Sequence, residues 1–205
     1  MKEVIPRKTV YRLSVYHRCL ERMVPGEDGR VSSDTLAKIA GVKPTQLRKD
    51  LACFGHFGKR GIGYDAQTLR ARLSEVLGTT RLQPVILIGA GNLGMALLGY
   101  QGFAKEGFEI IGAFDAQPER VEMKDLSTPV FPMTELQSFI KKNHVKMAIL
   151  AVPGHVAQEV CNELVEVGVQ AVLNFAPIIL QVPEHTVVNN VNLAIELENL
   201  SYFIR

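Results

Sequence analysis

The chain has 205 residues, of which 47% are hydrophobic, and this is enough for two domains with a core each. Residues 1–81 carry 16 Lys and Arg against 8 Asp and Glu, whereas residues 82–205 carry 7 against 13. A basic first part favours a polyanionic partner such as nucleic acid, although a merely solvated basic face has the same composition. No run approaches the ~20 apolar residues of a membrane span, so we expect a soluble, cytoplasmic protein with no membrane partner.

Cys19, Cys53 and Cys161 are far apart in the sequence, and none belongs to a CxxC or Cys/His pair. This spacing argues against a disulfide framework and against a zinc site. We therefore expect three free thiols and no metal ion.

Three helices are expected in the first part of the chain. A helix over residues 6–24 is predicted by apolar residues at helical spacing, namely Val10, Leu13, Tyr16, Leu20 and Val24. A short helix then runs to residue 40, with Ser32 or Ser33 as its N-cap, and Pro44 begins another that Gly55 ends. Two short helices joined by a tight, glycine-containing turn are typical of a helix-turn-helix.

The second of these short helices has two different faces. Leu47, Leu51 and Phe54 fall at positions i, i+4 and i+7, so they face a core. The residues left mostly outside are Gln46, Arg48, Lys49, Ala52 and Cys53. Arginine can bind guanine and glutamine can bind adenine in the major groove. DNA binding by this face is therefore favoured over a solvated surface helix.

The segment "GHFGKRGIGY" follows, with glycines at positions 55, 58, 61 and 63. So many glycines predict a tight hairpin that carries Lys59 and Arg60 at its tip. Such a basic wing can bind phosphates or enter a minor groove. A helix over residues 67–77 is expected to close the module, with residues 79–83 as a linker.

Beyond this linker, short apolar segments alternate with helical ones. Strands are predicted over residues 84–89, 108–115, 145–153, 169–175 and 186–191, and helices over residues 92–107, 134–144, 155–168 and 193–204. This alternation indicates right-handed βαβ units and a parallel sheet with helices on both faces.

The sequence "GAGNLG" follows the first of these strands directly and begins a helix, which is the context of a dinucleotide-binding turn. Gly89 permits the turn, Gly91 lets the backbone approach a pyrophosphate, and Gly94 permits close packing of helix on strand. Asp115 lies 21 residues beyond Gly94, where a carboxylate can bind ribose hydroxyls and oppose the 2′-phosphate of NADP(H). We expect NADH and NAD⁺ as ligands; glycines that only pack, or a site for another adenine nucleotide such as coenzyme A, are the alternatives.

Two further strand ends carry polar residues. His155 follows "AVPG" and could serve a dehydrogenase as general acid, but no second residue for it to work with is evident. A capping or surface role is therefore favoured, and we expect no catalytic residue and no enzyme. "NFAP", residues 174–177, lies at the sheet edge where ligands bind, and it either lines the pocket or turns the chain.

The combination of "QLRKDLACFGHFGKRGIGY" with "GAGNLG", "AFD", "AVP" and "NFAP" resembles the Rex family of redox-sensing transcriptional repressors over nearly the whole chain. The resemblance implies a winged-helix domain over residues 1–81 that binds double-stranded, pseudo-palindromic operator DNA. It implies a Rossmann domain over residues 82–190 that binds NADH and NAD⁺, and a C-terminal helix over residues 191–205 that is swapped in a homodimer. NADH would release the DNA, whereas NAD⁺ would permit binding. An NAD-dependent oxidoreductase and a CoA- or adenylate-binding regulator are the alternatives from other classes.

The resemblance also assigns residues to each part. The DNA-binding candidates are Ser33, Lys43, Thr45, Gln46, Arg48, Lys49, Phe57, Lys59 and Arg60. The nucleotide-binding candidates are Gly89, Ala90, Gly91, Asn92, Leu93, Gly94, Tyr100, Asp115, Val152, Pro153, Asn174, Phe175, Ala176 and Pro177. Arg18 at the domain junction would form the switch with Asn192 and Leu193 of the partner subunit. The family pattern generally has Asp where this chain has Asn192, which leaves a neutral hydrogen bond in place of a charged latch with Arg18.

Overall fold

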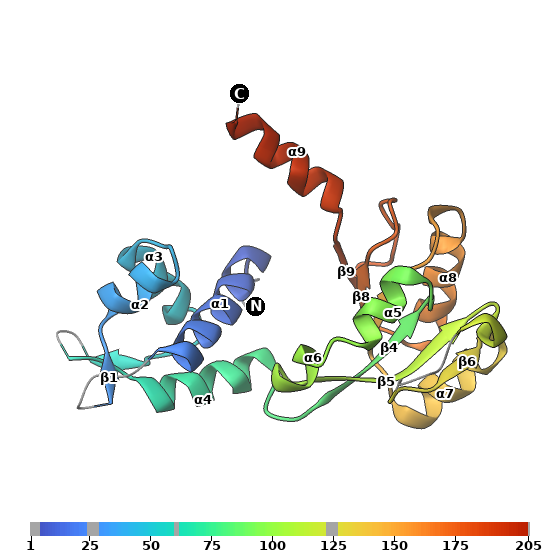
Figure 1. The fold of residues 1–205 in the computed structure, drawn as a ribbon. Helices are drawn as coiled ribbons and strands as arrows, with labels where there is room; N and C mark the ends of the chain where they lie inside the picture. The colour runs from blue at the N-terminus through green and yellow to red at the C-terminus, as the bar shows by residue number, and fades with distance from the viewer. Residues whose placement is uncertain (1–4, 24–28, 60–61, 122–126, 205) are drawn as a thin grey trace. The chain divides into compact units, whose positions relative to one another are not determined.

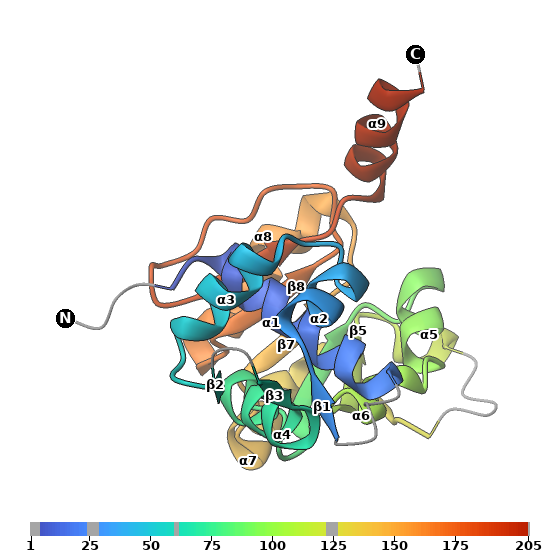
Figure 2. The ribbon, with the colours of Figure 1, turned by 90° about the vertical axis from the view of Figure 1, so that its left-hand side faces the viewer.

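The structure is a computed structural model, and it describes residues 5–23, 29–59, 62–121 and 127–204. The chain separates into two compact units, Met1–Arg81 and Leu82–Arg205, drawn in Figure 1 and, turned by 90°, in Figure 2. We describe each unit by itself.

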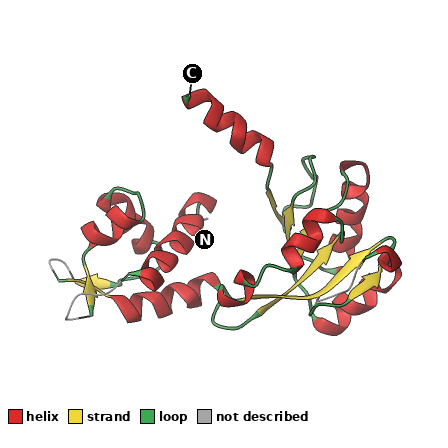
Figure 3. Ribbon diagram, viewed as in Figure 1, coloured by secondary structure: helices red, strands yellow, loops and turns green. Residues whose placement is uncertain are grey.

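The first unit combines helices with a small antiparallel sheet, as the colours of Figure 3 show. Its elements are α1 (Arg7–Arg22), β1 (Arg30–Val31), α2 (Ser33–Ile39), α3 (Pro44–Ala52), β2 (Gly58–Lys59), β3 (Gly63–Asp65) and α4 (Ala66–Leu77). The strands lie in the order β1-β3-β2.

A closed apolar core holds the helices of the first unit together. Side chains that are at most 2% exposed come from each of its four described helices: Leu13, Tyr16, Leu36, Leu47, Leu51, Leu69 and Leu73. Val10, one of the apolar residues whose spacing predicted α1, is 40% exposed, and Thr9 is buried instead. The reason is that α1 turns Thr9 toward the buried carboxylate of Asp50. Val24 lies outside the described residues.

The predicted helix-turn-helix is confirmed in α2 and α3. Ser32 is the N-cap of α2, and its Oγ accepts a hydrogen bond from the Thr35 backbone N–H at 3.0 Å. Gly41 has φ of 68°, a left-handed conformation that lets the chain turn sharply between the helices. Pro44 lies in the first turn of α3, where its missing N–H costs nothing.

The predicted glycine-rich hairpin is formed by β2 and β3. Gly58 pairs with Tyr64 and Lys59 with Gly63, both antiparallel. Gly63 has φ of 82°, and a β-carbon there would lie 2.6 Å from the backbone oxygen of Val31. Only glycine therefore fits at position 63, where β3 runs beside β1. Arg60 lies outside the described residues.

The second unit is built on a parallel sheet. Its elements are β4 (Gln83–Ile88), α5 (Asn92–Leu98), α6 (Gly102–Lys105), β5 (Phe108–Asp115), η1 (Pro118–Arg120), β6 (Val130–Pro132), η2 (Met133–Glu135), α7 (Leu136–Asn143), β7 (Met147–Leu150), α8 (Gly154–Val167), β8 (Ala171–Asn174), β9 (Val187–Asn190) and α9 (Leu193–Phe203). The six described strands lie in the order β6-β5-β4-β7-β8-β9, all parallel. This is the strand order of a Rossmann fold.

Apolar clusters cover both faces of the sheet. On one face, Ile86, Phe114 and Leu150 pack with Leu136 of α7 and Leu164 of α8. On the other face, sheet residues including Leu87, Ala113 and Ile149 pack with side chains of α5 and α6. The central strands β4, β5 and β7 are therefore mostly buried, as continuous apolar runs in the sequence predict, whereas the edge strand β9 is largely exposed.

The helix predicted over residues 92–107 is broken into α5 and α6, so that prediction is wrong in its extent. Gly99 ends α5, and Tyr100 turns its ring edge-on to Phe103, with the ring centroids 5.0 Å apart. A β-carbon on Gly102 would overlap the Tyr100 ring. Two glycines thus weaken the helix where an aromatic side chain folds back over it. The edge strand β6 was not predicted from the sequence.

Candidate functional site

The outward face of α3 carries much of the basic surface expected to bind DNA. Lys43, Thr45, Arg48 and Lys49 are exposed, whereas Gln46 is half-buried. Arg48 donates a hydrogen bond from Nη1 to the Oγ of Ser33 at 2.7 Å, which ties α3 to the start of α2. The structure thus brings four of the candidate DNA-binding residues onto α3, with Lys43 at its N-cap and Ser33 beside it.

The most heavily hydrogen-bonded group of this unit was not predicted from the sequence. Asp50 of α3 is 1% exposed, and Arg12 of α1 donates to both its oxygens, from Nη2 to Oδ1 and from Nε to Oδ2, each at 2.6 Å. Tyr16 donates to Oδ2 at 2.8 Å, Thr9 to Oδ1 at 3.2 Å, and Gln46 to Oδ1 at 2.9 Å. This cluster ties α1 to the middle of α3. The sequence signal that could have revealed this cluster is an acidic residue, Asp50, between the core residues Leu47 and Leu51.

The cluster shifts the acid–base behaviour of its members. Burial acts to raise the pKa of Asp50, but hydrogen bonds from Arg12, Tyr16 and Gln46 outweigh it and lower that pKa below its ordinary value of 3.8. Burial, with the hydrogen bond to Asp50, raises the pKa of Tyr16. The hydrogen bond to Asp50 raises the pKa of Arg12. Asp50 is therefore an anion and Tyr16 a neutral donor at physiological pH.

Of the three residues predicted in or near the wing, the structure describes the positions of Phe57 and Lys59. Lys59 is in β2, and Phe57 just before it is half-buried against the core of the first unit. Burial raises the pKa of Tyr64 in β3, and the positive charge of Arg48 partly offsets this. Phe57 thus packs the base of the wing against the core of the first unit.

The second candidate site lies where the strand order of the sheet reverses, between β4 and β7. In open parallel sheets, ligands bind outside the carboxyl ends of the strands at such a point. Gly89 has φ of 94°, and a β-carbon there would lie 2.5 Å from the backbone oxygen of Ala151, after β7. A β-carbon on Gly94 would overlap the backbone oxygen of Gly89, whereas one on Gly91 would meet nothing within 4 Å. Gly89 therefore permits the turn, Gly94 permits close packing of α5, and Gly91 leaves the loop accessible to a ligand.

Asp115, at the end of β5, is joined to the glycine loop. Its Oδ2 accepts a hydrogen bond from the backbone N–H of Ala90 at 2.8 Å, and its Oδ1 accepts one from that of Gln117 at 2.9 Å. Each oxygen keeps a further lone pair. The carboxylate is thus held in one orientation and can still accept hydrogen bonds from a ligand.

A polar hollow of about 440 Å³ opens between the glycine loop and Asp115. Its lining residues are Ala90, Gly91, Asn92, Met95, Asp115, Gln117, Arg120 and Val121. Four of these were predicted, whereas Met95, Gln117, Arg120 and Val121 were not. The last three follow β5, in and beside the short helix η1, where no sequence periodicity marks them.

The "NFAP" segment lies at the carboxyl end of β8, at the same edge of the sheet as Val152 and Pro153 after β7. Asn174 is 0% exposed; its Nδ2 donates to the backbone oxygen of Ile178 at 2.9 Å and to Oδ1 of Asn190 at 2.8 Å. Its Oδ1 accepts from the N–H of Ala176 at 2.9 Å. Asn174 therefore shapes the turn that carries Phe175, Ala176 and Pro177.

The residues predicted to form the switch lie in different units. We therefore describe the surroundings of each residue within its own unit. Arg18 of α1 is exposed. Asn192 is the N-cap of α9, and its Oδ1 accepts hydrogen bonds from the N–H groups of Ala194 at 3.0 Å and Ile195 at 3.3 Å. Leu193 is 64% exposed, and no residue of α9 is buried. Tyr100, a predicted cofactor neighbour, is 58% exposed.

His155 lies in the first turn of α8 and is exposed. Nowhere in the described ranges do three or more His, Cys, Asp or Glu side chains gather as metal ligands would. Cys19, Cys53 and Cys161 are free thiols. Within the part of the chain that the structure describes, every helix is too short or too polar to span a bilayer.

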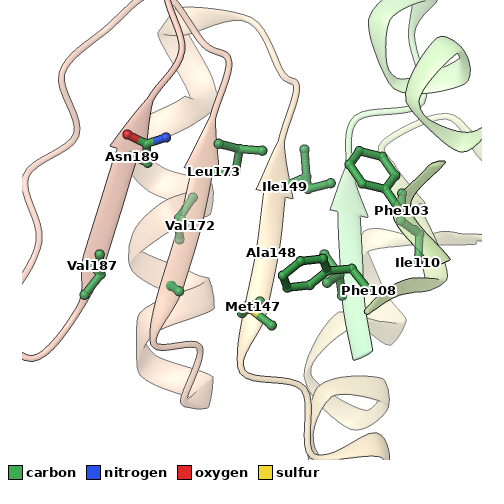
Figure 4. A pocket seen from close by; sticks show the side chains of 12 residues that line it. Phe103, Phe108, Ile110, Met147, Ala148, Ile149, Val172, Leu173, Val187 and Asn189 are labelled. Carbon is green, nitrogen blue, oxygen red and sulfur yellow. The ribbon is translucent and has the colours of Figure 1, made fainter. Parts of the chain in front are cut away.

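An apolar groove of about 260 Å³ lies apart from the polar hollow, across the sheet face that α5 and α6 cover only in part. Figure 4 shows Phe103, Ile149, Leu173 and Val187 along it, from α6, β7, β8 and β9. Asn189 adds a polar group at one end. The groove offers no charged side chain to a phosphate, so it does not compete with the glycine loop as a nucleotide site.

Curated proteins named redox-sensing transcriptional repressor Rex are similar to the chain over nearly its whole length. The chain is 44% identical to the one from Pelotomaculum thermopropionicum, over 97% of this chain and 93% of the relative. It is 42% identical to the one from Carboxydothermus hydrogenoformans, over 98% of this chain and 97% of the relative. The chain belongs to the Rex family.

Solved structures of the Rex family have the same fold. A crystal structure of RSP in complex with beta-NAD⁺ and operator DNA matches with a TM-score of 0.90 at 36% identity, over 98% of this chain and 93% of that chain. A crystal structure of RSP in complex with beta-NADH matches with a TM-score of 0.85 at 35% identity, over 98% and 94% of the two chains. Family models described as "Putative DNA-binding protein N-terminus" and "CoA binding domain" match residues 4–52 and 80–178. The predicted fold class, a winged-helix domain with a Rossmann-type parallel sheet, is confirmed.

Proposed function

We propose that this protein is a redox-sensing transcriptional repressor that binds operator DNA with its first unit and releases it when NADH binds to its second unit. The observation that carries the proposal is the match, over 98% of this chain, to a Rex-family structure with both beta-NAD⁺ and operator DNA. It would act in the cytoplasm, together with its operator.

The DNA-binding part of the proposal rests on the basic first unit and on α3. Arg48 and Lys49 are exposed on α3, where guanidinium and ammonium groups can reach base edges and phosphates. Lys59 and Arg60 of the wing would bind the backbone or a minor groove. In a homodimer, two such helices would enter major-groove faces about 34 Å apart or a multiple of that. The operator would then be pseudo-palindromic.

The nucleotide-binding part rests on the glycine loop and Asp115. The open side of Gly91 fits the close approach of a pyrophosphate, and the hollow beside Asp115 fits an adenosine ribose. The carboxylate would accept hydrogen bonds from a free 2′-hydroxyl and repel a 2′-phosphate. NADH and NAD⁺ would therefore bind in preference to their 2′-phosphorylated forms.

The switch would lie between subunits. In α9 and just after it, apolar side chains are at least half exposed: Leu193, Ile195, Leu197, Leu200, Tyr202, Phe203 and Ile204. We propose that α9 crosses to the partner subunit of a homodimer, where Leu193 would help to close the nicotinamide pocket. An apolar pocket favours the neutral reduced ring over the cationic oxidised ring, because burying an unpaired charge is costly. Arg18 would donate a hydrogen bond to the uncharged side chain of Asn192 of the partner subunit in one of the two states.

NADH would serve as a signal and not as a reactant. His155 is the candidate acid of a dehydrogenase, but in the described residues no carboxylate forms an ion pair with it. The relatives that are 44% and 42% identical are named as transcriptional repressors, which supports a signalling role for NADH.

The experiment is a titration of the complex between the full-length protein and a palindromic operator duplex. NADH should dissociate the complex at concentrations at which NAD⁺ and coenzyme A do not. By thermodynamic reciprocity, operator DNA must weaken NADH binding by the same factor by which NADH weakens DNA binding, commonly about 5- to 150-fold. If the operator leaves NADH affinity unchanged, redox sensing is excluded but DNA binding is not. Release by coenzyme A alone, or turnover of NADH, would favour the regulator or the oxidoreductase.

A further inference from the structure

We propose that Asp50 is a positioning residue for DNA reading: it sets the orientation of the Gln46 side-chain amide on α3, so that Gln46 selects adenine at one position of each operator half-site. This inference rests on the proposed DNA-binding function. It assigns a specificity role to a residue that lies in the core and that DNA does not touch.

The geometry places Asp50 directly beneath Gln46. The two residues are four positions apart on α3, and Nε2 of Gln46 donates to Oδ1 of Asp50 at 2.9 Å. Asp50 is itself immobilised by Arg12, Tyr16 and Thr9 of α1. Its side chain is 2% exposed, so water does not compete for it. The amide of Gln46 is thus anchored to a fixed acceptor.

The charge of Asp50 decides which end of the amide faces inward. An ionised carboxylate only accepts hydrogen bonds, so it must face the NH₂ group of Gln46 and not its oxygen. Hydrogen bonds from Arg12, Tyr16 and Gln46 keep the pKa of Asp50 low, so it stays ionised. A neutral asparagine at this position could face either end and would leave the orientation undetermined.

The anchored amide keeps one N–H and its oxygen for DNA. A glutamine binds adenine with these two groups, because its N–H donates to N7 and its oxygen accepts from N6. Asp50 takes the other N–H, so it does not compete with the base. Because the orientation is set before DNA binds, less side-chain entropy is lost on binding. A flipped amide would present two donors and no acceptor, and it would lose the preference for adenine.

The test measures the affinity of the full-length protein for operator duplexes that differ by one base pair. The variant Gln46→Ala first identifies the base pair at which discrimination, which we expect to be about 5- to 150-fold for a bidentate contact, is lost. Asp50→Asn should lose discrimination at that same base pair and keep it elsewhere. The double variant should be no worse there than either single variant, because both remove the same contact. Leu73→Ala is the matched control, because it removes buried apolar contacts from the same core but no hydrogen bond to Asp50; it should keep the discrimination.

Three outcomes would overturn the proposal. One is full discrimination in folded Asp50→Asn, another is an equal loss at every base pair, and the third is the same selective loss in Leu73→Ala. If Asp50→Asn does not fold, the double variant Arg12→Met with Asp50→Leu is used in its place. It replaces the buried ion pair with apolar side chains, a change that proteins often tolerate. In the wild type, one Nε2 proton of Gln46 should exchange with water more slowly than the other by NMR; equal, fast exchange contradicts the anchor. A wild type that binds all duplexes equally would instead refute the DNA-binding function itself.

Discussion

The two units differ in whether their own chain covers their apolar surface. The first unit closes its apolar core on itself and buries a carboxylate, Asp50, that its own helices neutralise and hydrogen-bond. The second unit leaves an apolar groove on its sheet and an apolar helix, α9, without cover in the single chain. We infer from this difference that the first unit keeps its shape when the protein switches. We also infer that a partner subunit covers the apolar surface of the second unit, and that a ligand changes the arrangement there.

The largest expected effect comes from removing the apolar character of α9. Leu197→Glu combined with Leu200→Glu changes four leucines in a dimer, each worth about 1.5 kcal/mol or more if buried there. We therefore expect at least about 6 kcal/mol less dimer stability and a monomer by light scattering or sedimentation. Glu198→Lys, an exposed change on the same helix, should stay dimeric. A dimer that survives the leucine changes would place the interface elsewhere.

Breaking the charge cluster should damage the first unit alone. Arg12→Ala leaves the carboxylate of Asp50 buried without its cation, which typically costs about 3–5 kcal/mol. Calorimetry should show a lower unfolding temperature for the first unit, while NADH binding by the second persists. The control is Arg72→Ala, which breaks an exposed ion pair with Glu75 at 3.0 Å and should cost less than about 1 kcal/mol. Similar losses in both variants would contradict the distinction between the two pairs.

Asp115→Ala tests the nucleotide site. It removes hydrogen bonds to a charged acceptor, each worth about 1.5–3 kcal/mol, and it also removes the repulsion of a 2′-phosphate. NADH should lose about 10-fold or more in affinity, whereas NADPH should lose less, so the preference narrows. Isothermal calorimetry with both ligands measures this, and Glu119→Ala on the nearby exposed turn is the control. An unchanged preference would mean that Asp115 only holds the glycine loop through Ala90.

The smallest expected effects separate base reading from backbone binding within the first unit. Arg48→Ala should cost about 1–3 kcal/mol on the cognate operator and relax its sequence preference. Lys59→Ala should weaken cognate and random DNA alike and reduce the salt dependence of binding. Fluorescence anisotropy at several salt concentrations distinguishes the two. Equal losses on both DNAs for Arg48→Ala would remove it from base readout.

Much of the fold follows from the sequence alone, because apolar spacing decides which face of an element is buried. Leu47 and Leu51 in α3 and the apolar runs of β4 and β5 were predicted in this way. The glycine loop could be recognised because only glycine fits at Gly89, where φ is 94° and Ala151 lies against it. The glycine motif together with Asp115 predicted NAD(H) as the ligand, and the family resemblance added the release of operator DNA by NADH.

What only the tertiary structure decided concerns contacts between residues far apart in the chain. Thr9 is buried and Val10 is not, because Asp50, 41 positions away from Thr9, needs a donor. The break between α5 and α6 depends on an aromatic contact that local propensity does not contain. Gln117 and Arg120 join the hollow only because β5 ends beside the glycine loop. Apolar spacing in the local sequence predicts most of the buried apolar side chains. Burial of a polar side chain such as Thr9, and the choice of its partner, depend on packing between distant segments, which is known only once the chain is folded.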